Sequence, residues 1–229
     1  MSEWWTYTLS DFLMFAPRTY YRMIELYNVA IWPAQLIAMA VGVAVAVLLA
    51  GRRGGRDRII CALLAGCWLW IAWSFHYQRY AQINWAASWF AAAFALEALL
   101  LAGVGVVAGR IALRPAGSVR CTVAVVLIAM TVVGYPLLAW LTTRPWTTAE
   151  TFGAAPDPTA IATVAVLALA GGRIRFLLLV VPVLWCAVAA ATLWAMDSRA
   201  DALVVACLTV LALWPAIRGT PATGRLLPG

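Results

Sequence analysis

Polar side chains that could bind a small molecule are concentrated in two short stretches of an otherwise apolar chain. The first, residues 74–84, holds the single histidine, His76. The second is the Asp-Pro-Thr motif at 157–159. Their imidazole, guanidinium, amide, carboxylate and hydroxyl groups together supply donors, acceptors and charges of both signs. We expect both stretches to line one outward-facing ligand cavity. The residues predicted to line it are His76, Arg79, Asn84, Tyr135, Asp157 and Thr159.

Asp157 also has a structural interpretation. Aspartate caps the free amides at a helix start, and proline is tolerated at the first helical position. Asp157 followed by Pro158 therefore predicts the beginning of a helix. Amides at such a start could also bind an anionic group. The sequence leaves both interpretations open.

Glu97 is the one carboxylate well inside an apolar segment. It lies 12 residues after Trp85, which is about 18 Å along a helix. A carboxylate at that depth is costly unless it is protonated or paired, and it often marks a proton pathway. We expect Glu97 to face the bundle interior and to be neutral at pH 7, as a proton site or as a structural residue. Its candidate neighbours are Gln35, Thr131, Tyr135 and Thr163.

Residue counts exclude several cofactors. A retinal Schiff base needs a lysine, and all sixteen basic residues are arginine. Bis-histidine haem and multi-histidine zinc sites need more than the single His76. No glycine-framed serine elbow accompanies Ser74 or Ser88. We therefore expect no cofactor, no metal and no catalytic residue, and an enzyme is the third-ranked function class.

Composition places the chain in a membrane. Hydrophobic residues make up 65% of the 229, charged residues 11%, and the mean hydropathy is +0.91, whereas soluble domains average about 25% charged residues. The predicted fold is all-α: a bundle of about seven transmembrane helices. The fifth apolar segment is the shortest, so it crosses with little tilt, recruits residues 152–158 to lengthen its span, or dips into the bilayer without crossing. The segments are 31–50, 59–76, 86–108, 120–142, 158–171, 176–196 and 201–217.

Arginines alternate between the connections. Eleven of the sixteen follow the first, third, fifth and seventh segments. The positive-inside rule makes those connections cytoplasmic, with the amino terminus outside and the carboxyl terminus inside. The net charge of +7 is then a topological signal beside anionic lipid. Because the arginines are dispersed over short loops, we expect no nucleic-acid partner.

The ends of the chain are assigned separately from the bundle. Residues 1–30 mix aromatic and charged side chains at roughly helical spacing, interrupted by Pro17. This pattern predicts an interfacial segment on the outer surface, as an anchoring belt or as a lid. Residues 31–217 form the predicted membrane domain. Residues 218–229 form a short cytoplasmic tail.

Several motifs carry a resemblance to a known family. They lie at 2–7, 17–21, 25–28, 32–35, 76–77, 83–84, 134–137 and 152–159, and the last reads Phe-Gly-Ala-Ala-Pro-Asp-Pro-Thr. The chain resembles an uncharacterised bacterial family of polytopic integral membrane proteins, catalogued only as a domain of unknown function. Members carry Pro-Cys-Pro-Thr where this chain has Asp157, so no thiol function is implied there. The resemblance implies a bacterial inner membrane protein but no activity.

Two function classes stay open besides the enzyme. In the first, the protein binds or transports a small molecule through the outward-facing cavity, with Glu97 as a deeper proton site. In the second, it is a structural or accessory subunit. The aromatic amino-terminal belt and small-residue faces such as Gly103 and Gly105 would then pack against a membrane partner protein or a second copy of the chain. The lipid bilayer is the partner common to both.

Overall fold

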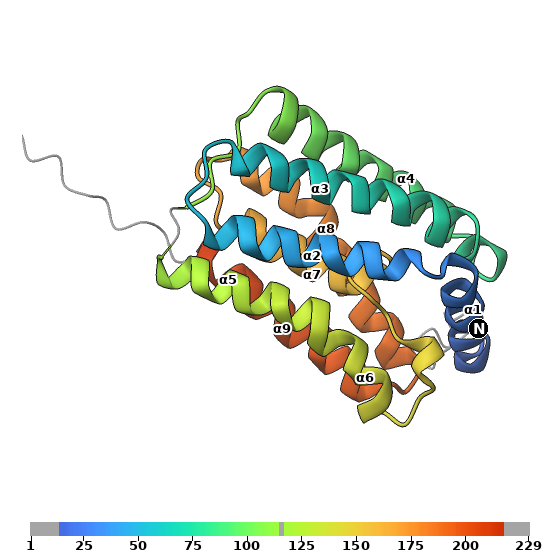
Figure 1. Ribbon diagram of the computed structural model, residues 1–229. Helices are drawn as coiled ribbons and strands as arrows, with labels where there is room; N and C mark the ends of the chain where they lie inside the picture. Colours follow the sequence, from blue (N-terminus) through green and yellow to red (C-terminus); the bar gives the residue numbers. More distant parts are fainter. Residues whose placement is uncertain (1–13, 115–116, 218–229) are drawn as a thin grey trace, which may run out of the picture.

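The structure, a computed structural model, describes residues 14–114 and 117–217. These residues form helices, and their one β-type contact is an isolated bridge between Leu113 and Ala170. The α-helices of this part of the chain (Figure 1) are α1 Pro17–Ile31, α2 Ala34–Ala50, α3 Arg56–Trp70, α4 Ala87–Leu100, α5 Val119–Ala129, α6 Tyr135–Leu141, α7 Pro156–Leu167, α8 Ile174–Ala195 and α9 Arg199–Ile217.

Three π-helical segments lengthen these helices. Ile71–Tyr77 continues α3, Leu101–Val107 continues α4, and Met130–Gly134 joins α5 to α6. The last of them ends two residues before Pro136, which has no amide hydrogen to donate and whose ring crowds the carbonyl one turn earlier. A locally wider turn relieves that crowding. Two short 3-10 turns, Tyr80–Gln82 and Trp146–Thr148, lie in the connecting loops.

The helices are apolar and long enough for a membrane bundle. Each predicted apolar segment coincides with a helix or a joined pair of helices. Five continuous stretches qualify as membrane spans by length and composition, and a sixth is counted if α1 and α2, which meet at 90°, form one broken span. Seven crossings are not confirmed. The 12-residue α7 rises only about 18 Å. The qualifying stretches are Arg56–Gln82, Ala87–Val107, Val119–Leu141, Ile174–Ala195 and Arg199–Ala216.

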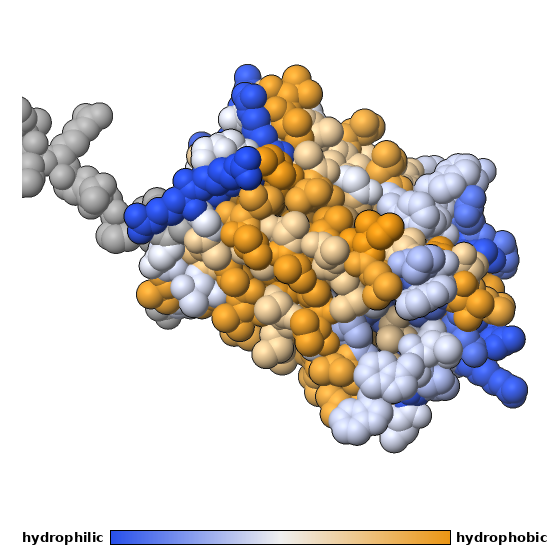
Figure 2. All heavy atoms as spheres, viewed as in Figure 1, coloured by the Kyte–Doolittle hydropathy of each residue, from blue (hydrophilic) through white to orange (hydrophobic). Residues whose placement is uncertain are grey.

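Hydropathy is distributed as a lipid-facing bundle requires. Figure 2 shows a broad band of hydrophobic residues between hydrophilic residues at the two ends of the molecule. On α2, for example, Ile37 and Val47 are 68% and 64% exposed. Contiguous exposed apolar surface of this kind is rare on soluble monomers. The fold is therefore that of an apolar, all-helical protein suited to a membrane.

One end of the bundle collects the loops that are rich in arginine. The Arg56 guanidinium donates to the carbonyl oxygens of Leu49 at 2.8 Å and Arg114 at 2.6 Å. The Arg175 guanidinium donates to the carbonyl oxygens of Ala170 and Ala216 at 3.0 and 3.1 Å. The loops after α2, after the π-helical extension of α4 and after α7 thus lie together with the end of α9. We call this the arginine end.

The opposite end, which we call the α1 end, is closed by α1. This helix lies across the bundle in Figure 1. The Tyr21 hydroxyl lies 2.8 Å from the Ser198 hydroxyl, in the turn between α8 and α9. The Asn28 amide donates to the carbonyl oxygens of Thr147 and Ala149 in the loop after α6. The two sets of connections therefore occupy opposite ends, as the alternating arginines predict.

α7 forms the centre of the bundle. Every residue from 149 to 170 is buried, and α7 packs against α3, α5, α8 and α9. The side chains of α7 are mostly small, and its two buried threonines bond inside the core. Thr163 donates to the Thr159 carbonyl and accepts from the Trp68 indole at 2.9 Å. A helix that is apolar on all sides is typical of a protein core or a membrane span, and α7 is enclosed by protein.

Gly105 allows a close contact between helices. A Cβ added there would lie 2.5 Å from the Cys61 sulfur and 2.6 Å from the Cys61 Cβ, whereas one added at Gly103 would meet nothing within 4 Å. We predict that Gly105→Ala destabilises the protein by about 1–3 kcal/mol through overpacking. The measurement is the thermal unfolding midpoint in detergent. Gly103→Ala is the matched control, because it makes the same change in the same π-helical segment. Equal midpoints for the two variants would contradict the prediction.

Candidate functional site

Asp157 connects three helices at the α1 end. It lies in the first turn of α7 and is 2% exposed. The Trp185 indole of α8 donates to its Oδ1 at 2.8 Å, and the Tyr135 hydroxyl of α6 donates to its Oδ2 at 3.3 Å. The predicted capping role of Asp157 is wrong. The helix begins one residue earlier, at Pro156, without a side-chain cap, so the carboxylate is free to bond to neighbouring helices.

Glu150 is a second buried carboxylate near Asp157. It lies in the loop between α6 and α7, is 8% exposed, and accepts a 3.3 Å hydrogen bond from the Tyr20 hydroxyl of α1. Burial raises the pKa of Glu150 well above its ordinary value, and the negative charge of Asp157 raises it further. Arg144 acts in the opposite direction. The geometry therefore favours a protonated Glu150 beside Asp157.

Asp201 is a third buried carboxylate at the α1 end, and Arg144 is its ion-pair partner. Arg144 pairs with Asp201 at 2.9 Å, and their side chains are 17% and 6% exposed. The same guanidinium donates to the Thr142 hydroxyl at 2.9 Å and lies 4.5 Å from the ring centroid of Tyr21. Within the described part of the chain, this is the one ion pair that involves Glu150, Asp157 or Asp201. We call Glu150, Asp157 and Asp201 the carboxylate cluster.

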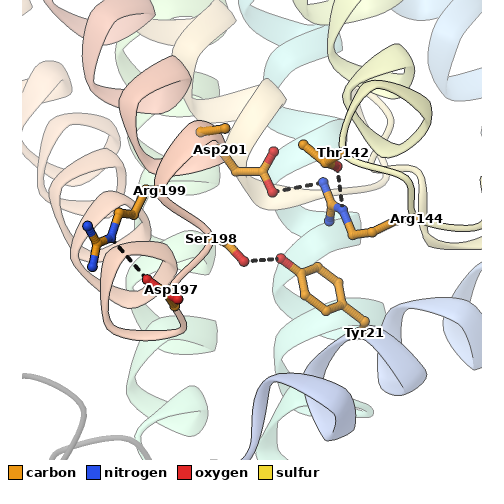
Figure 3. Close-up of a pocket in the computed structure, with 8 residues that line it drawn as sticks. Tyr21, Thr142, Arg144, Asp197, Ser198, Arg199 and Asp201 are labelled. Carbon is orange, nitrogen blue, oxygen red and sulfur yellow. Dashed lines mark hydrogen bonds and ion pairs between the residues drawn. The ribbon is translucent and has the colours of Figure 1, made fainter.

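Two cavities border the cluster. A pocket of about 740 Å³, which we call the vestibule, opens beside the Arg144–Asp201 pair (Figure 3) and is also lined by Tyr21, Ser198 and Arg199. A much smaller cavity of about 10 Å³ touches Asp157. This second volume is close to what one water molecule needs. Its other lining residues are Tyr20, Tyr80, Trp185, Ala189, Thr192, Leu193 and Met196.

His76 lies near the cluster but does not bond to it. Its ring is fully buried, with centroids 4.4 Å from Phe94 and 4.8 Å from Trp185, and neither nitrogen has a hydrogen-bond partner among the described residues. Trp185 thus contacts both His76 and Asp157. The imidazole is enclosed by aromatic rings and does not line the cavity at Asp157.

The other predicted site residues lie elsewhere. The Thr159 hydroxyl accepts from the Gly153 amide and donates to the Ala155 carbonyl, so it closes the loop before α7. The Asn84 side chain accepts from the Ala86 amide in a turn. Arg79 lines a different groove, described below. Of the six predicted residues, Tyr135 and Asp157 bond to each other, and His76 is linked to them through Trp185.

Glu97 faces the bundle interior, as predicted, and is fully buried on α4. Neither carboxyl oxygen has a hydrogen-bond partner among the described residues. The four candidate neighbours have other partners: Gln35 donates to the Asn28 carbonyl, Thr131 donates to the Ile128 carbonyl, and Tyr135 and Thr163 bond as described above. Glu97 is thus an unpartnered carboxyl group in the apolar part of the bundle.

Sequence reasoning missed several residues of the site. Trp185, Arg144 and Glu150 carry bonds and charges around Asp157 but stand in no motif, and Tyr20 stands in the motif at 17–21 but was not predicted as a site residue. One signal could have found Glu150 and also Asp201, because both lie in the connections expected on the same side as Asp157. Within the described residues no group of three His, Cys, Asp or Glu side chains could hold a metal ion.

Comparison with known proteins gives a family but no activity. The model of a family of unknown function (DUF6064) matches residues 18–222. Comparison with curated proteins and with solved structures finds no match.

The burial of Glu150 predicts a pH-dependent stability. Because its pKa is raised in the folded state, the stability that this group contributes is full below about pH 4.3 and is lost as the pH rises through the folded-state pKa. We predict that Glu150→Gln flattens the fall of the thermal unfolding midpoint with rising pH. Asp197→Asn, at a carboxylate whose side chain is 83% exposed, is the control. An unchanged pH profile in Glu150→Gln would refute the prediction.

Proposed function

The chain belongs to this family of unknown function, because the family model matches most of its length, and we propose that it binds a cationic small molecule at the α1 end. The observation that carries the proposal is the carboxylate cluster, in which three buried carboxylates are accompanied by a single partly buried arginine, Arg144, paired with Asp201. Buried carboxylates are costly unless they are protonated or meet positive charge. A bound cation would supply that charge.

The surroundings of the cluster also suit a cation. Tyr21 borders the vestibule and already stacks with the Arg144 guanidinium. Tyr20, Tyr80 and Trp185 border the cavity at Asp157. Aromatic faces attract organic cations, most strongly where water is excluded. The vestibule volume of about 740 Å³ lies within the range of small-molecule pockets.

The Arg144–Asp201 pair would control the entry of the cation from the vestibule to Asp157. It lines the vestibule, and Arg144 also acts electrostatically on Glu150. A cation that replaced Arg144 beside Asp201 would open a route from the vestibule to Asp157. Protons and cations would then compete for the same carboxylates, so binding would release protons.

The proposed topology makes this site outward-facing. The arginine end would lie in the cytoplasm, as the positive-inside rule favours, and α1 would lie along the outer surface. α2, α7 and the five long helical stretches would give seven crossings, with α7 shielded from lipid by its neighbours. Glu97, deeper on α4, would be a proton site for transport. Its buried and unpartnered carboxyl group supports that role.

We predict that Asp157→Asn weakens cation binding by about tenfold or more, which is about 1.4 kcal/mol. The probe is ethidium, measured by fluorescence anisotropy on the purified protein at pH 8 and again at pH 5. The wild type should bind less at pH 5. Asparagine keeps an oxygen to accept from Trp185, so folding is preserved. Glu25→Gln, at a carboxylate that lines neither the vestibule nor the cavity at Asp157, is the matched control and should bind like the wild type.

Three other outcomes would contradict the proposed cation site. Equal binding by Asp157→Asn and the wild type would exclude Asp157 as the site. Preference for an organic anion over ethidium would reverse the proposed charge of the ligand. If native mass spectrometry showed a second polypeptide bound in place of a ligand, the accessory-subunit class would be favoured.

The transport part of the proposal predicts a separate effect of Glu97→Gln. Proteoliposomes containing DNA would report ethidium entry by increased fluorescence when a pH gradient is imposed. Glu97→Gln should lose gradient-driven entry while it keeps equilibrium binding, because the amide cannot exchange a proton. Glu97→Asp, which retains a titratable group, should keep part of the entry. Full entry in Glu97→Gln would exclude this residue as the proton site.

A further inference from the structure

A second charged feature at the α1 end has the opposite sign. A groove of about 350 Å³ lies between α1 and the turn after the π-helical extension of α3. Its lining includes three arginines, Arg18, Arg22 and Arg79, and no carboxylate. We call it the arginine groove.

The arginines of this groove have little countercharge. Arg22 pairs with Glu25 at 2.7 Å on the exposed side of α1. Arg18 and Arg79 make no ion pair within residues 14–114 and 117–217. Three guanidinium groups around one groove repel each other, and an anion between them would relieve that repulsion. The planar fork of donors on each guanidinium matches the oxygens of a phosphate group.

Apolar side chains line the same groove. Met23 and Ile83 lie on its walls, and Leu26 is 49% exposed. A site that bound only a soluble anion would not require these apolar side chains. A ligand that joins a phosphate to a hydrocarbon chain would contact both kinds of side chain.

The orientation of α1 places the groove at the depth of lipid headgroups. α1 meets α2 at 90°, so if α2 crosses the bilayer along its normal, α1 lies parallel to the surface. Trp32, directly after α1, is 66% exposed, and exposed tryptophans favour the interface. Amphipathic helices lying in that plane bind anionic lipid through basic residues.

We propose that the arginine groove binds the headgroup phosphate of an anionic phospholipid from the leaflet next to α1. The guanidinium groups of Arg18, Arg22 and Arg79 contact the phosphate oxygens, and the start of an acyl chain lies along Met23, Leu26 and Ile83. Binding this lipid fixes α1 against the bundle.

The test uses delipidated protein in neutral detergent at fixed ionic strength. Thermal unfolding is followed during titration with dioctanoyl phosphatidylglycerol, dioctanoyl phosphatidylcholine or inorganic phosphate. We expect phosphatidylglycerol to raise the midpoint in a saturable manner, at a concentration at least about tenfold lower than the other two require. Arg18→Gln/Arg79→Gln should lose this preference. The matched control is Arg52→Gln/Arg53→Gln, two exposed arginines at the opposite end, which should keep it.

Three results would overturn the proposal. Inorganic phosphate acting at the same concentration as phosphatidylglycerol would assign the groove to a soluble anion. Equal effects of the two lipids would exclude recognition of charge. An unchanged preference in Arg18→Gln/Arg79→Gln would place the lipid elsewhere. If that variant fails to fold, the single change Arg18→Gln, at an exposed residue, must weaken the effect for the proposal to stand.

Discussion

The structure depends on the enclosure of a helix that is too short to reach both ends of the bundle. α7 has 12 residues, and all of them are buried. Loops must therefore enter the bundle to complete its path. The segment before α7 enters at the α1 end, where Glu150 and the residues after it are buried. At the arginine end, the Arg114 amide bonds to the Leu169 carbonyl just after α7.

The carboxylate cluster follows from this arrangement. A long transmembrane helix would keep its polar flanks at the membrane surface, but a short central one draws them inside. Glu150 and Asp157 are buried for this reason, and each finds a hydroxyl or indole donor on a neighbouring helix. Buried polar groups are normally satisfied in this way. The cluster remains acidic because Arg144 already pairs with Asp201.

Local patterns predicted the helices well, because hydropathy along a segment reflects the solvent around it. Alternating arginines also predicted which connections meet, and the bonds of Arg56 and Arg175 agree. Side-chain partners were harder to predict, because they depend on how each helix is rotated. Tyr135 turns toward Asp157, whereas His76 turns into a group of aromatic rings and Arg79 toward α1. All three looked equivalent in the sequence, since each is a polar residue expected near the same end.

α1 contributes residues to both charged features of the α1 end, the carboxylate cluster and the arginine groove. Tyr20 and Tyr21 reach Glu150 and Ser198 on the side of the carboxylate cluster, while Arg18 and Arg22 line the arginine groove. The same short helix thus contacts an acidic region inside the bundle and forms a basic groove facing away from it. A rigid displacement of α1 changes the bond to Glu150 and the spacing of the arginines together. Any lipid that holds the arginines in place therefore also holds Tyr20 and Tyr21 beside the cluster and the vestibule.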